Sequence, residues 1–423
     1  MRKLASVVTI DQLLPIEGAN MIETATMVGK GWNVVVKKGE FSPGDLAVYF
    51  EIDSYLDPDD ERYSFLKDRC LRKFVSKAGQ VLRDGIRIKT IKLRGQLSQG
   101  LLLPIAQFIG QDKEIQNFDK PATPENCVAD DGKPLTAEEL AGMMVSTLTA
   151  KIVHEGTADT EAWVEKIEVT DGTDLTSLLK VEHYDEVKEQ LTPMTGGGTI
   201  SADAMGKFPS DYCPKSDEER IQNLGDWFIK YADRKWEVTN KDDGSSCSMF
   251  YSPTIDGENP FGVCSRNLRL KPESASGVVP AMWLMAKKYL VEEKLKALYE
   301  KDGSEWVLQG EFVAPGLQKN RDKYIKPEWH VFRIWDVKAQ RFVEPSVRRK
   351  FCSENNIPHV TVVAEDMPVF QKFRTCDELL KFAEGKTARG NEREGVVFKT
   401  SDGLEPQLSF KAVSNLYLLK QED

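Results

Sequence analysis

A lysine stands where a predicted strand gives way to a turn, in the stretch VTNKDDGSSCSMF (238–250). Residues 236–239 have the pattern of a strand end, and Lys241 follows, ahead of two aspartates, a glycine and two serines. An unprotonated lysine amine is a nucleophile, and burial or neighbouring cations lower its pKa. Small residues after it let backbone N–H groups approach a phosphate. Taken alone, the stretch fits a surface hairpin better than a nucleophile.

Further stretches with charged or aromatic residues follow Lys241 in a fixed order. They are GVCSRN with Arg266, QGEF with Glu311, HVFRIWDV with Phe332 and Trp335, REGVVFK with Glu394 and Lys399, and LSFKAV with Lys411. Each of them is common on protein surfaces or in strands when it occurs alone. The ordered set is the specific signal.

In this order the stretches resemble the motifs of the covalent nucleotidyltransferases, which include polynucleotide ligases and capping guanylyltransferases. The chain is most similar to the ATP-dependent RNA ligases, in particular the Deinococcus-type branch with an N-terminal OB module. WNVVVKKGEFSPGDLAVYFEID and FPSDYCPKSDEERIQNL also resemble that branch. The resemblance covers roughly residues 1–110 and 208–420.

The resemblance implies three phosphoryl-transfer steps, in which positioning and charge neutralisation do most of the catalytic work. A lysine attacks the α-phosphate of ATP and keeps AMP, the AMP passes to a 5′-phosphate end, and a 3′-OH then displaces it. The implied substrate is nicked duplex nucleic acid, with RNA expected on the 3′-OH strand. ATP and Mg²⁺ or Mn²⁺ are the implied cofactors.

The resemblance also implies roles for individual residues. Lys241 is the expected nucleophile, and Lys399 and Lys411 are expected to hold the α-phosphate and to keep Lys241 neutral. The other expected contacts are Arg266 to phosphate, Glu311 to the ribose, Trp335 or Phe332 stacked on adenine, Asn240 at the base, and Glu394 and Asp243 on the metal.

Three positions depart from the pattern of the branch. Asn240 stands where an acid more often accepts the adenine amino group, although an amide oxygen can accept the same hydrogen bond. Asp242 replaces a residue that is often apolar. The last motif has Lys411 with Ser409 two residues before it, in place of a second lysine.

The N-terminal region has short predicted strands separated by Gly/Pro turns, a pattern of small barrels and sandwiches. Residues 86–94 alternate apolar and basic side chains, which predicts one cationic strand face. Such a face on an OB-like barrel fits a nucleic-acid surface, although a solvated face that binds nothing is the alternative. The expected contacts are Arg83, Arg87, Lys89, Lys92 and Arg94.

The predicted fold class is α+β, with an OB-like barrel (1–110), an acidic insert and linker (111–207), and an adenylyltransferase domain of antiparallel sheets with flanking helices (208–423). Helices are expected at 135–144, 215–232 and 279–299, and strands at 236–239, 247–251, 306–312, 331–336 and 394–399. Residues 192–206 are expected to form a flexible linker.

Composition points to a cytoplasmic protein without a membrane segment, and a monomer is expected. The net charge is −10, the seven cysteines show no CxxC pair, and no apolar run reaches eighteen residues. Two alternatives to an RNA ligase stay open. One is a GTP-dependent capping guanylyltransferase, which, like a DNA ligase, usually carries its OB module after the catalytic domain. The other is an inactive nucleic-acid-binding relative.

Overall fold

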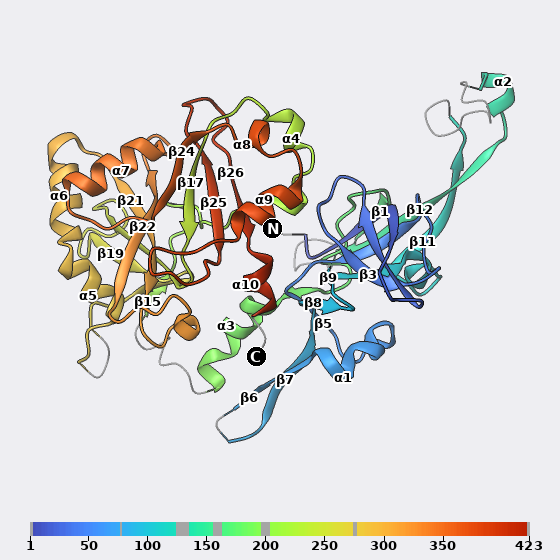
Figure 1. The fold of residues 1–423 in the computed structure, drawn as a ribbon, viewed down its shortest axis with the longest axis horizontal. Helices are drawn as coiled ribbons and strands as arrows, with labels where there is room; N and C mark the ends of the chain where they lie inside the picture. Colours follow the sequence, from blue (N-terminus) through green and yellow to red (C-terminus); the bar gives the residue numbers. More distant parts are fainter. Residues whose placement is uncertain are drawn as a thin grey trace. The chain divides into compact units, whose positions relative to one another are not determined.

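The computed structural model describes residues 3–76, 78–123, 135–154, 163–195, 204–273 and 277–420. The chain divides into two compact units, which the colours of Figure 1 separate along the sequence. Unit 1 comprises residues 1–28 and 32–197, and unit 2 comprises residues 29–31 and 198–423.

Unit 1 contains a five-stranded antiparallel sheet in the order β10-β4-β1-β2-β3. Its strands are β1 (Ala5–Pro15), β2 (Ile22–Met27), β3 (Val34–Lys37), β4 (Leu46–Phe50) and β10 (Leu101–Pro104). The backbone N–H of Gln99 donates to the carbonyl of Asn33 at 2.8 Å, which draws the two sheet edges together. The sheet therefore forms a nearly closed barrel, as the sequence predicted.

The predicted cationic strand at 86–94 is broken into two strands that belong to different sheets. A four-stranded sheet, β14-β5-β7-β6, contains β5 (Ser54–Leu56), β6 (Leu71–Val75), β7 (Val81–Arg87) and β14 (Glu182–His183). A separate hairpin pairs β8 (Thr90–Leu93) with β9 (Gln96–Gln99). Short helices η1 (Glu61–Leu66), α1 (Lys67–Cys70) and η2 (Ile105–Phe108) complete this part.

The segment that follows residue 110 belongs to unit 1 and has its own sheet, β11-β12-β13. Its elements are β11 (Ile115–Pro121), α2 (Ala137–Leu140), β12 (Met144–His154), β13 (Trp163–Glu168) and α3 (Tyr184–Thr195). Ile115, Ala150 and Leu175 pack in one core with Val7 and Phe50 of the barrel strands. This packing differs from the expected boundary at residue 110, because the segment supplies side chains to that core.

Unit 2 is built on two sheets whose strand orders place the catalytic motifs. The seven-stranded sheet β15-β20-β19-β18-β21-β22-β23 contains β15 (Ala204–Lys207), β18 (Ser245–Tyr251), β19 (Phe261–Cys264), β20 (Leu268–Leu270), β21 (Trp306–Val313), β22 (Glu328–Asp336) and β23 (Arg341–Phe342). The five-stranded sheet β16-β26-β25-β17-β24 contains β16 (Glu219–Arg220), β17 (Trp236–Lys241), β24 (Val362–Met367), β25 (Gly395–Thr400) and β26 (Ser409–Val413). The five strands predicted from the motifs are confirmed.

Helices cover these sheets, and two of the predicted ones differ in the structure. The helices are η3 (Ile221–Asn223), α4 (Trp227–Lys230), α5 (Ala281–Lys288), α6 (Val291–Asp302), η4 (Gln318–Asn320), α7 (Pro345–Glu354), α8 (Val369–Lys372), α9 (Cys376–Ala383) and α10 (Asn415–Leu419). The helix expected at 279–299 breaks at Leu290, whose φ is 49°. The helix expected at 215–232 is wrong, because Glu219 and Arg220 instead pair in parallel with β26.

Three smaller predictions have mixed outcomes. Thr136 caps α2 in a capping box with Glu139, which confirms the short helix there. Much of the linker expected at 192–206 lies outside the described residues. The cysteines within the described residues carry free thiols.

None of the helices in the described ranges combines the length and apolar composition that a bilayer crossing needs.

Candidate active site

Lys241 is the last residue of β17, and the turn after it leads directly to β18 in the other sheet of unit 2. Gly244 in this turn lies so close to the next sheet that an added Cβ would sit 2.3 Å from the carbonyl oxygen of Phe312. Lys241 Nζ forms an ion pair with Glu394 Oε1 at 2.8 Å. The two sheets therefore meet at the predicted nucleophile.

Carboxylates surround the Lys241 amine from both sheets. Glu311 comes from β21 and Glu394 from the residue before β25, while Asp243 lies in the turn after Lys241. Burial, with smaller contributions from the carboxylates of Glu394, Asp242 and Asp243, raises the pKa of Glu311 to about 8 against the opposing effect of Lys241. The site thus holds more acids than cations.

This acidic surrounding corrects the expectation that nearby cations keep Lys241 neutral. Burial lowers the pKa of Lys241, but Glu394 and Glu311 outweigh that effect, so the pKa lies above its usual value. Lys411 and Arg321 are opposing cations near the cluster. In the free protein the amine is therefore protonated and must lose its proton before it can attack.

Lys411 and Arg266 are brought together by an aspartate that the sequence analysis did not single out. Asp217 binds Lys411 Nζ at 2.8 Å and lies 3.9 Å from Arg266 Nη2. Burial lowers the pKa of Lys411, and Asp217 acts in the opposite direction. Lys411 and Arg266 thus form one cationic site, and in the structure Asp217 is the anion at that site.

Lys399 does not lie beside Lys241. In the ladder between β17 and β25, Lys241 pairs with Gly395 and Lys399 pairs with Glu237. Four residues along a strand separate these Cα positions by about 13 Å, and Lys399 is not among the groups with the largest effects on the pKa of Lys241. The structure therefore does not support the expectation that Lys399 keeps that amine neutral. Burial lowers the pKa of Lys399 to about 8.

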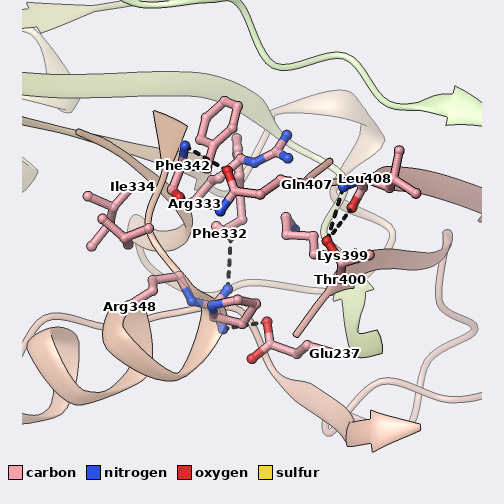
Figure 2. A pocket seen from close by; sticks show the side chains of 12 residues that line it. Glu237, Phe332, Arg333, Ile334, Phe342, Arg348, Lys399, Thr400, Gln407 and Leu408 are labelled. Atoms are coloured by element: carbon pink, nitrogen blue, oxygen red, sulfur yellow. Dashed lines mark hydrogen bonds and ion pairs between the residues drawn. The ribbon is translucent and has the colours of Figure 1, made fainter. Parts of the chain in front are cut away.

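A pocket between the two sheets contains Lys399, and Figure 2 shows it from close by. Phe332 lines it, and Lys399 Nζ lies 5.8 Å from the centre of that ring. Arg348 spans the pocket floor, where it donates to the carbonyl of Phe332 at 2.9 Å and to Glu237 at 2.9 Å. The pocket is thus lined by an aromatic ring, by cationic side chains and by strands of both sheets.

Trp335 lies elsewhere. Its indole N–H donates to the carbonyl of Tyr212 at 3.1 Å, and its ring packs edge-on against Phe342 at 4.9 Å. A bulge in the β21–β22 ladder, between the Gln309 and Gly310 pairs, lies beside Phe332. The structure therefore brings Phe332, not Trp335, into the pocket with Lys399.

Asn240, the residue before Lys241, is 6 % exposed. Its backbone N–H donates to the carbonyl of Thr361 at 2.9 Å, and its Oδ1 lies 3.5 Å from Arg393 Nη1. Arg393 is itself 8 % exposed and donates to the carbonyl of Ala383. The amide oxygen proposed to read the base is thus partly engaged by an arginine.

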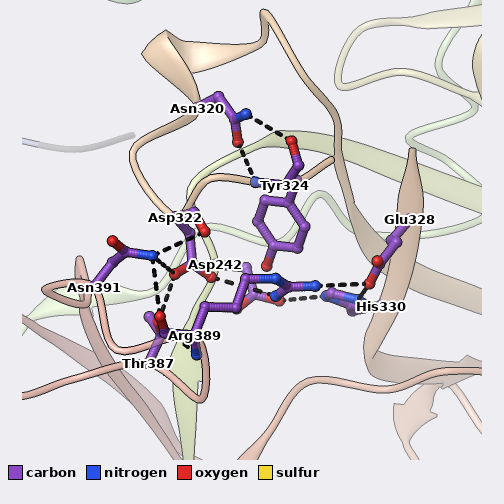
Figure 3. Close-up of polar contacts among 9 residues, drawn as sticks. All are labelled: Asp242, Asn320, Asp322, Tyr324, Glu328, His330, Thr387, Arg389 and Asn391. Carbon is purple, nitrogen blue, oxygen red and sulfur yellow. Dashed lines mark hydrogen bonds and ion pairs between the residues drawn. The ribbon is translucent and has the colours of Figure 1, made fainter. Parts of the chain in front are cut away.

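Asp242, the second unusual position, belongs to a polar network (Figure 3) and is also one of the carboxylates that raise the pKa of Glu311. Its Oδ2 lies 2.7 Å from His330 Nδ1, and His330 Nε2 lies 3.2 Å from Glu328. Burial lowers the pKa of His330, but hydrogen bonds with Asp242 and Glu328 outweigh it, so this pKa is raised. Arg389 adds an ion pair to Glu328 at 3.2 Å.

The carboxylates beside Lys241 can accept a divalent cation. Glu394 Oε2 is buried and has no hydrogen-bond partner, which leaves a lone pair directed into the protein. Asp243 accepts a hydrogen bond from the Tyr417 hydroxyl, and burial raises its pKa. Within the described ranges no three acidic, His or Cys side chains close on one point. A cation would therefore draw further ligands from water and phosphate, as Mg²⁺ usually does.

Two of the five predicted nucleic-acid contacts in unit 1 are bound by acids. Arg83 is bound by Glu182, and Arg87 Nη2 lies 2.7 Å from Asp53, with its guanidinium 4.0 Å over the Tyr184 ring. The other three contacts differ from these two. Lys92 and Arg94 are exposed on the β8–β9 hairpin, and Lys89 is half-buried and has an interaction of its own. The single cationic face expected from the sequence is not formed.

Several residues of the site were missed by the sequence analysis. Asp217 and Glu218 fell inside the helix expected at 215–232, whereas Asp217 binds Lys411 and Glu218 lies 3.5 Å from Arg333. His330 stands at the start of the HVFRIWDV motif, but nothing in the sequence links it to Asp242. Only the pairing of β22 with β21, which sets His330 opposite Glu311, shows that it faces the site.

Comparison with known proteins agrees with this geometry. A family model described as an OB-fold domain matches residues 4–105, and one described as RNA ligase matches residues 234–413. No curated protein matches the chain.

Solved structures of an RNA ligase from Naegleria gruberi are similar over the whole chain. A mutant with ATP and Mn is 30 % identical, with 100 % of both chains covered and a TM-score of 0.70. Another mutant, with AMP and Mn, is 30 % identical over 99 % of both chains at the same TM-score of 0.70. A third structure, with PPi, is 29 % identical over 100 % of this chain and 99 % of that one, with a TM-score of 0.70. This chain therefore belongs to the RNA ligase family, with an OB-fold domain ahead of its ligase domain.

Proposed function

We propose that this RNA ligase is ATP-dependent and carries AMP on Lys241. The Nζ–phosphorus bond forms at the α-phosphate, the bond from that phosphorus to the bridging oxygen breaks, and pyrophosphate leaves. The carrying observation is the Lys241 amine at the end of β17, 2.8 Å from Glu394 and between two sheets. The Naegleria structures with ATP, AMP and PPi support a similar chain's binding of the nucleotide, of AMP and of the pyrophosphate product.

Glu394 and Asp243 are the proposed ligands of a divalent cation, and Mn in the Naegleria structures supports the choice. When bound there, Mg²⁺ or Mn²⁺ would neutralise carboxylate charge and phosphate charge. Because Glu394 and Glu311 hold the pKa of Lys241 high, neutralising them lowers it toward the range in which the amine can attack.

The nucleotide contacts follow from the placement of the side chains. Glu311 binds the ribose, Lys411 and Arg266 bind phosphate after Asp217 releases them, and the base stacks on Phe332 rather than on Trp335. Asn240 contributes to base choice together with Arg393. Lys399 acts at the pocket end of the site, where its distance from Lys241 suits the base or ribose better than the α-phosphate.

In the proposed second and third steps, AMP moves to a 5′-phosphate and a 3′-OH attacks that activated end. We propose a nick in duplex nucleic acid as the substrate, with RNA on the 3′-OH strand, and a monomeric cytoplasmic enzyme. The RNA ligase family and the OB-fold domain support a nucleic-acid substrate.

The test is transfer of label from ATP, labelled at the α-phosphate, to the protein in the presence of Mg²⁺. Wild type and the control Lys235→Ala, an exposed lysine just before β17, are expected to label equally. Lys241→Ala is expected to lose the label by at least a thousandfold, since nothing replaces its bond to phosphorus. Labelling of Lys241→Ala would refute the mechanism.

The same experiment separates the two alternatives. A guanylyltransferase would label from GTP in preference to ATP. An inactive nucleic-acid-binding relative would label from neither nucleotide while still binding RNA. Sealing of nicks that carry one ribonucleotide on either side in turn would then define the strand preference.

A further inference from the structure

The sheet β11-β12-β13 has two chemically different faces, which its register defines. Ile115 pairs with Ala150 and Ala150 with Ile167, so these three side chains share one face. Ile115 and Ala150 are buried in the core of unit 1, and Leu148, two residues before Ala150, packs against it. We call this side the core face.

The opposite side, here called the outer face, carries Phe118, Lys120, Lys151, Val164, Lys166 and Glu168. Two contacts confirm that they share a side: Lys166 Nζ lies 4.3 Å over the Phe118 ring, and Lys120 binds Glu168 at 2.7 Å. Phe118 is 50 % exposed and Val164 is 47 % exposed. An aromatic ring on a sheet therefore stands half in solvent with lysines around it.

The charge of the outer face is opposite to that of its segment. Residues 112–174 contain fifteen acids and five bases, yet three of those bases lie on this one face. Lys151 stands directly opposite Lys166 in the ladder, an arrangement of like charges that destabilises a sheet. The outer face thus carries three lysines and one acid, Glu168. Lys151 and Lys166 repel each other, and an anion bound between them would relieve that repulsion.

An exposed aromatic ring flanked by cations is the arrangement with which sheet surfaces hold unpaired bases and the phosphates between them. We propose that the outer face binds single-stranded RNA, with a base replacing the Lys166 ammonium over the Phe118 ring and phosphate held by Lys151 and the displaced Lys166. The inference rests on the proposed function in one respect, since it assigns the substrate of the ligase to this surface.

Two other surfaces of unit 1 fit RNA less well. On the core face Trp163 is 54 % exposed, but Glu165 and Asp119 lie on the same side and repel phosphate. On β7, Arg83 and Arg87 are already bound by Glu182 and Asp53. Charge therefore favours the outer face.

The experiment measures binding of a fluorescently labelled single-stranded oligoribonucleotide to the full-length protein by anisotropy, without ATP. Phe118→Ala is expected to weaken binding about tenfold, within the range known for loss of one stacked base. Lys151→Ala and Lys166→Ala are each expected to flatten the plot of log affinity against log salt by about 0.7. Phe118→Leu, which keeps the apolar bulk, is expected to weaken binding like Phe118→Ala, and Phe118→Tyr is expected to restore it.

Matched controls lie on the core face of the same sheet. Trp163→Ala removes an exposed aromatic residue, and Glu165→Gln changes the net charge by one unit, opposite in sign to a lysine variant. Both are expected to bind RNA as wild type does. Equal RNA affinity of Phe118→Ala and wild type would overturn the proposal and leave the face for a protein partner. The proposal would also be overturned if Trp163→Ala weakened RNA binding as much as Phe118→Ala does. It would be overturned as well if Phe118→Ala weakened binding of a fully paired RNA duplex equally, because duplex bases cannot stack on Phe118.

The binding result is independent of the lysyl-AMP test. If wild-type protein fails to label from ATP but binds RNA through Phe118, the proposed function fails and the outer face stands. If wild-type protein labels from ATP but the outer-face variants bind RNA normally, the proposed function stands and the outer-face proposal fails.

Discussion

Three lysines of the ligase domain have the same side chain and different protonation chemistry, because each has a different neighbour. Glu394 and Glu311 hold the pKa of Lys241 above its usual value, whereas burial holds the pKa of Lys411 and Lys399 below it. Sequence order identified all three as functional candidates. It did not show which lysine would be protonated, since that depends on carboxylates that lie far away in the chain.

Lys399→Met is expected to stabilise the protein by about 1–3 kcal/mol at pH 7, because a buried charge without a tight ion pair costs roughly that much. The pKa of Lys399 is lowered from 10.5 to about 8, so the folded state loses this proton near pH 8 and the unfolded state keeps it up to about pH 10.5. The penalty in wild type is therefore full below pH 8 and fades as the pH rises toward 10.5.

Urea unfolding of Lys399→Met and wild type at pH 7 and at about pH 10 measures this difference. The stability gain should shrink at the higher pH, at which wild-type Lys399 is largely neutral. Lys235→Met, at an exposed position of the same domain, should change stability little at either pH. A gain that does not depend on pH would show that packing, not charge, is the cause.

At the scale of elements, the strands were predictable and the helices less so. Residues 236–239 alternate apolar and polar side chains, and residues 394–399 contain an apolar run. Both stretches lie in strands of one sheet. Residues 215–232 have apolar spacing typical of a helix, but Asp217 and Glu218 face Lys411 and Arg333, and Arg220 pairs beside Lys411. Tertiary ion pairs outweighed local propensity there. The sequence contains no signal for such long-range pairs.

The turn that carries Asp242 is joined to β22 through His330, and we expect this contact to position the neighbouring Lys241. His330→Gln and Asp242→Asn are each expected to slow lysyl-AMP formation about tenfold, since a charge-assisted hydrogen bond contributes roughly 1.5–3 kcal/mol. Because both residues act through one pair, the double variant should be no slower than either single one.

Single-turnover labelling with saturating ATP, followed across pH, measures this contribution. In wild type the benefit of the pair is present at low pH and declines above the raised pKa of His330, whereas the variants should lack that decline. His183→Gln, the same substitution in unit 1, serves as the control. Additive losses in the double variant would mean that the two residues act separately.

At the scale of the whole molecule, the boundary between the units was the part that the sequence located least well. The composition shift at residue 110 is real, but an acidic, Thr-rich segment can still supply apolar side chains to a neighbouring core. Ile115, Val169 and Leu175 do so, and they pack with barrel residues more than sixty residues away. Such contacts cannot be inferred from local composition, because the register that buries them is set by strand pairing.

Two truncations test where unit 1 ends. A protein of residues 198–423 keeps the core of the ligase domain, although it loses the segment 29–31 of its unit, and should be monodisperse and form lysyl-AMP at a rate near wild type. A protein of residues 111–423 keeps Ile115, Ala150 and Val169 without the barrel that covers them. It should aggregate, because an exposed apolar patch of that kind promotes association. Light scattering distinguishes a monodisperse protein from an aggregated one. Equal dispersity of the two truncations would place the boundary at residue 110 after all.

The 198–423 protein also tests whether unit 1 binds the substrate. As the salt concentration rises, its nick sealing should fall well before its lysyl-AMP formation does, since phosphate contacts of unit 1 are lost. Equal sealing by 198–423 and the full chain would exclude unit 1 from substrate binding.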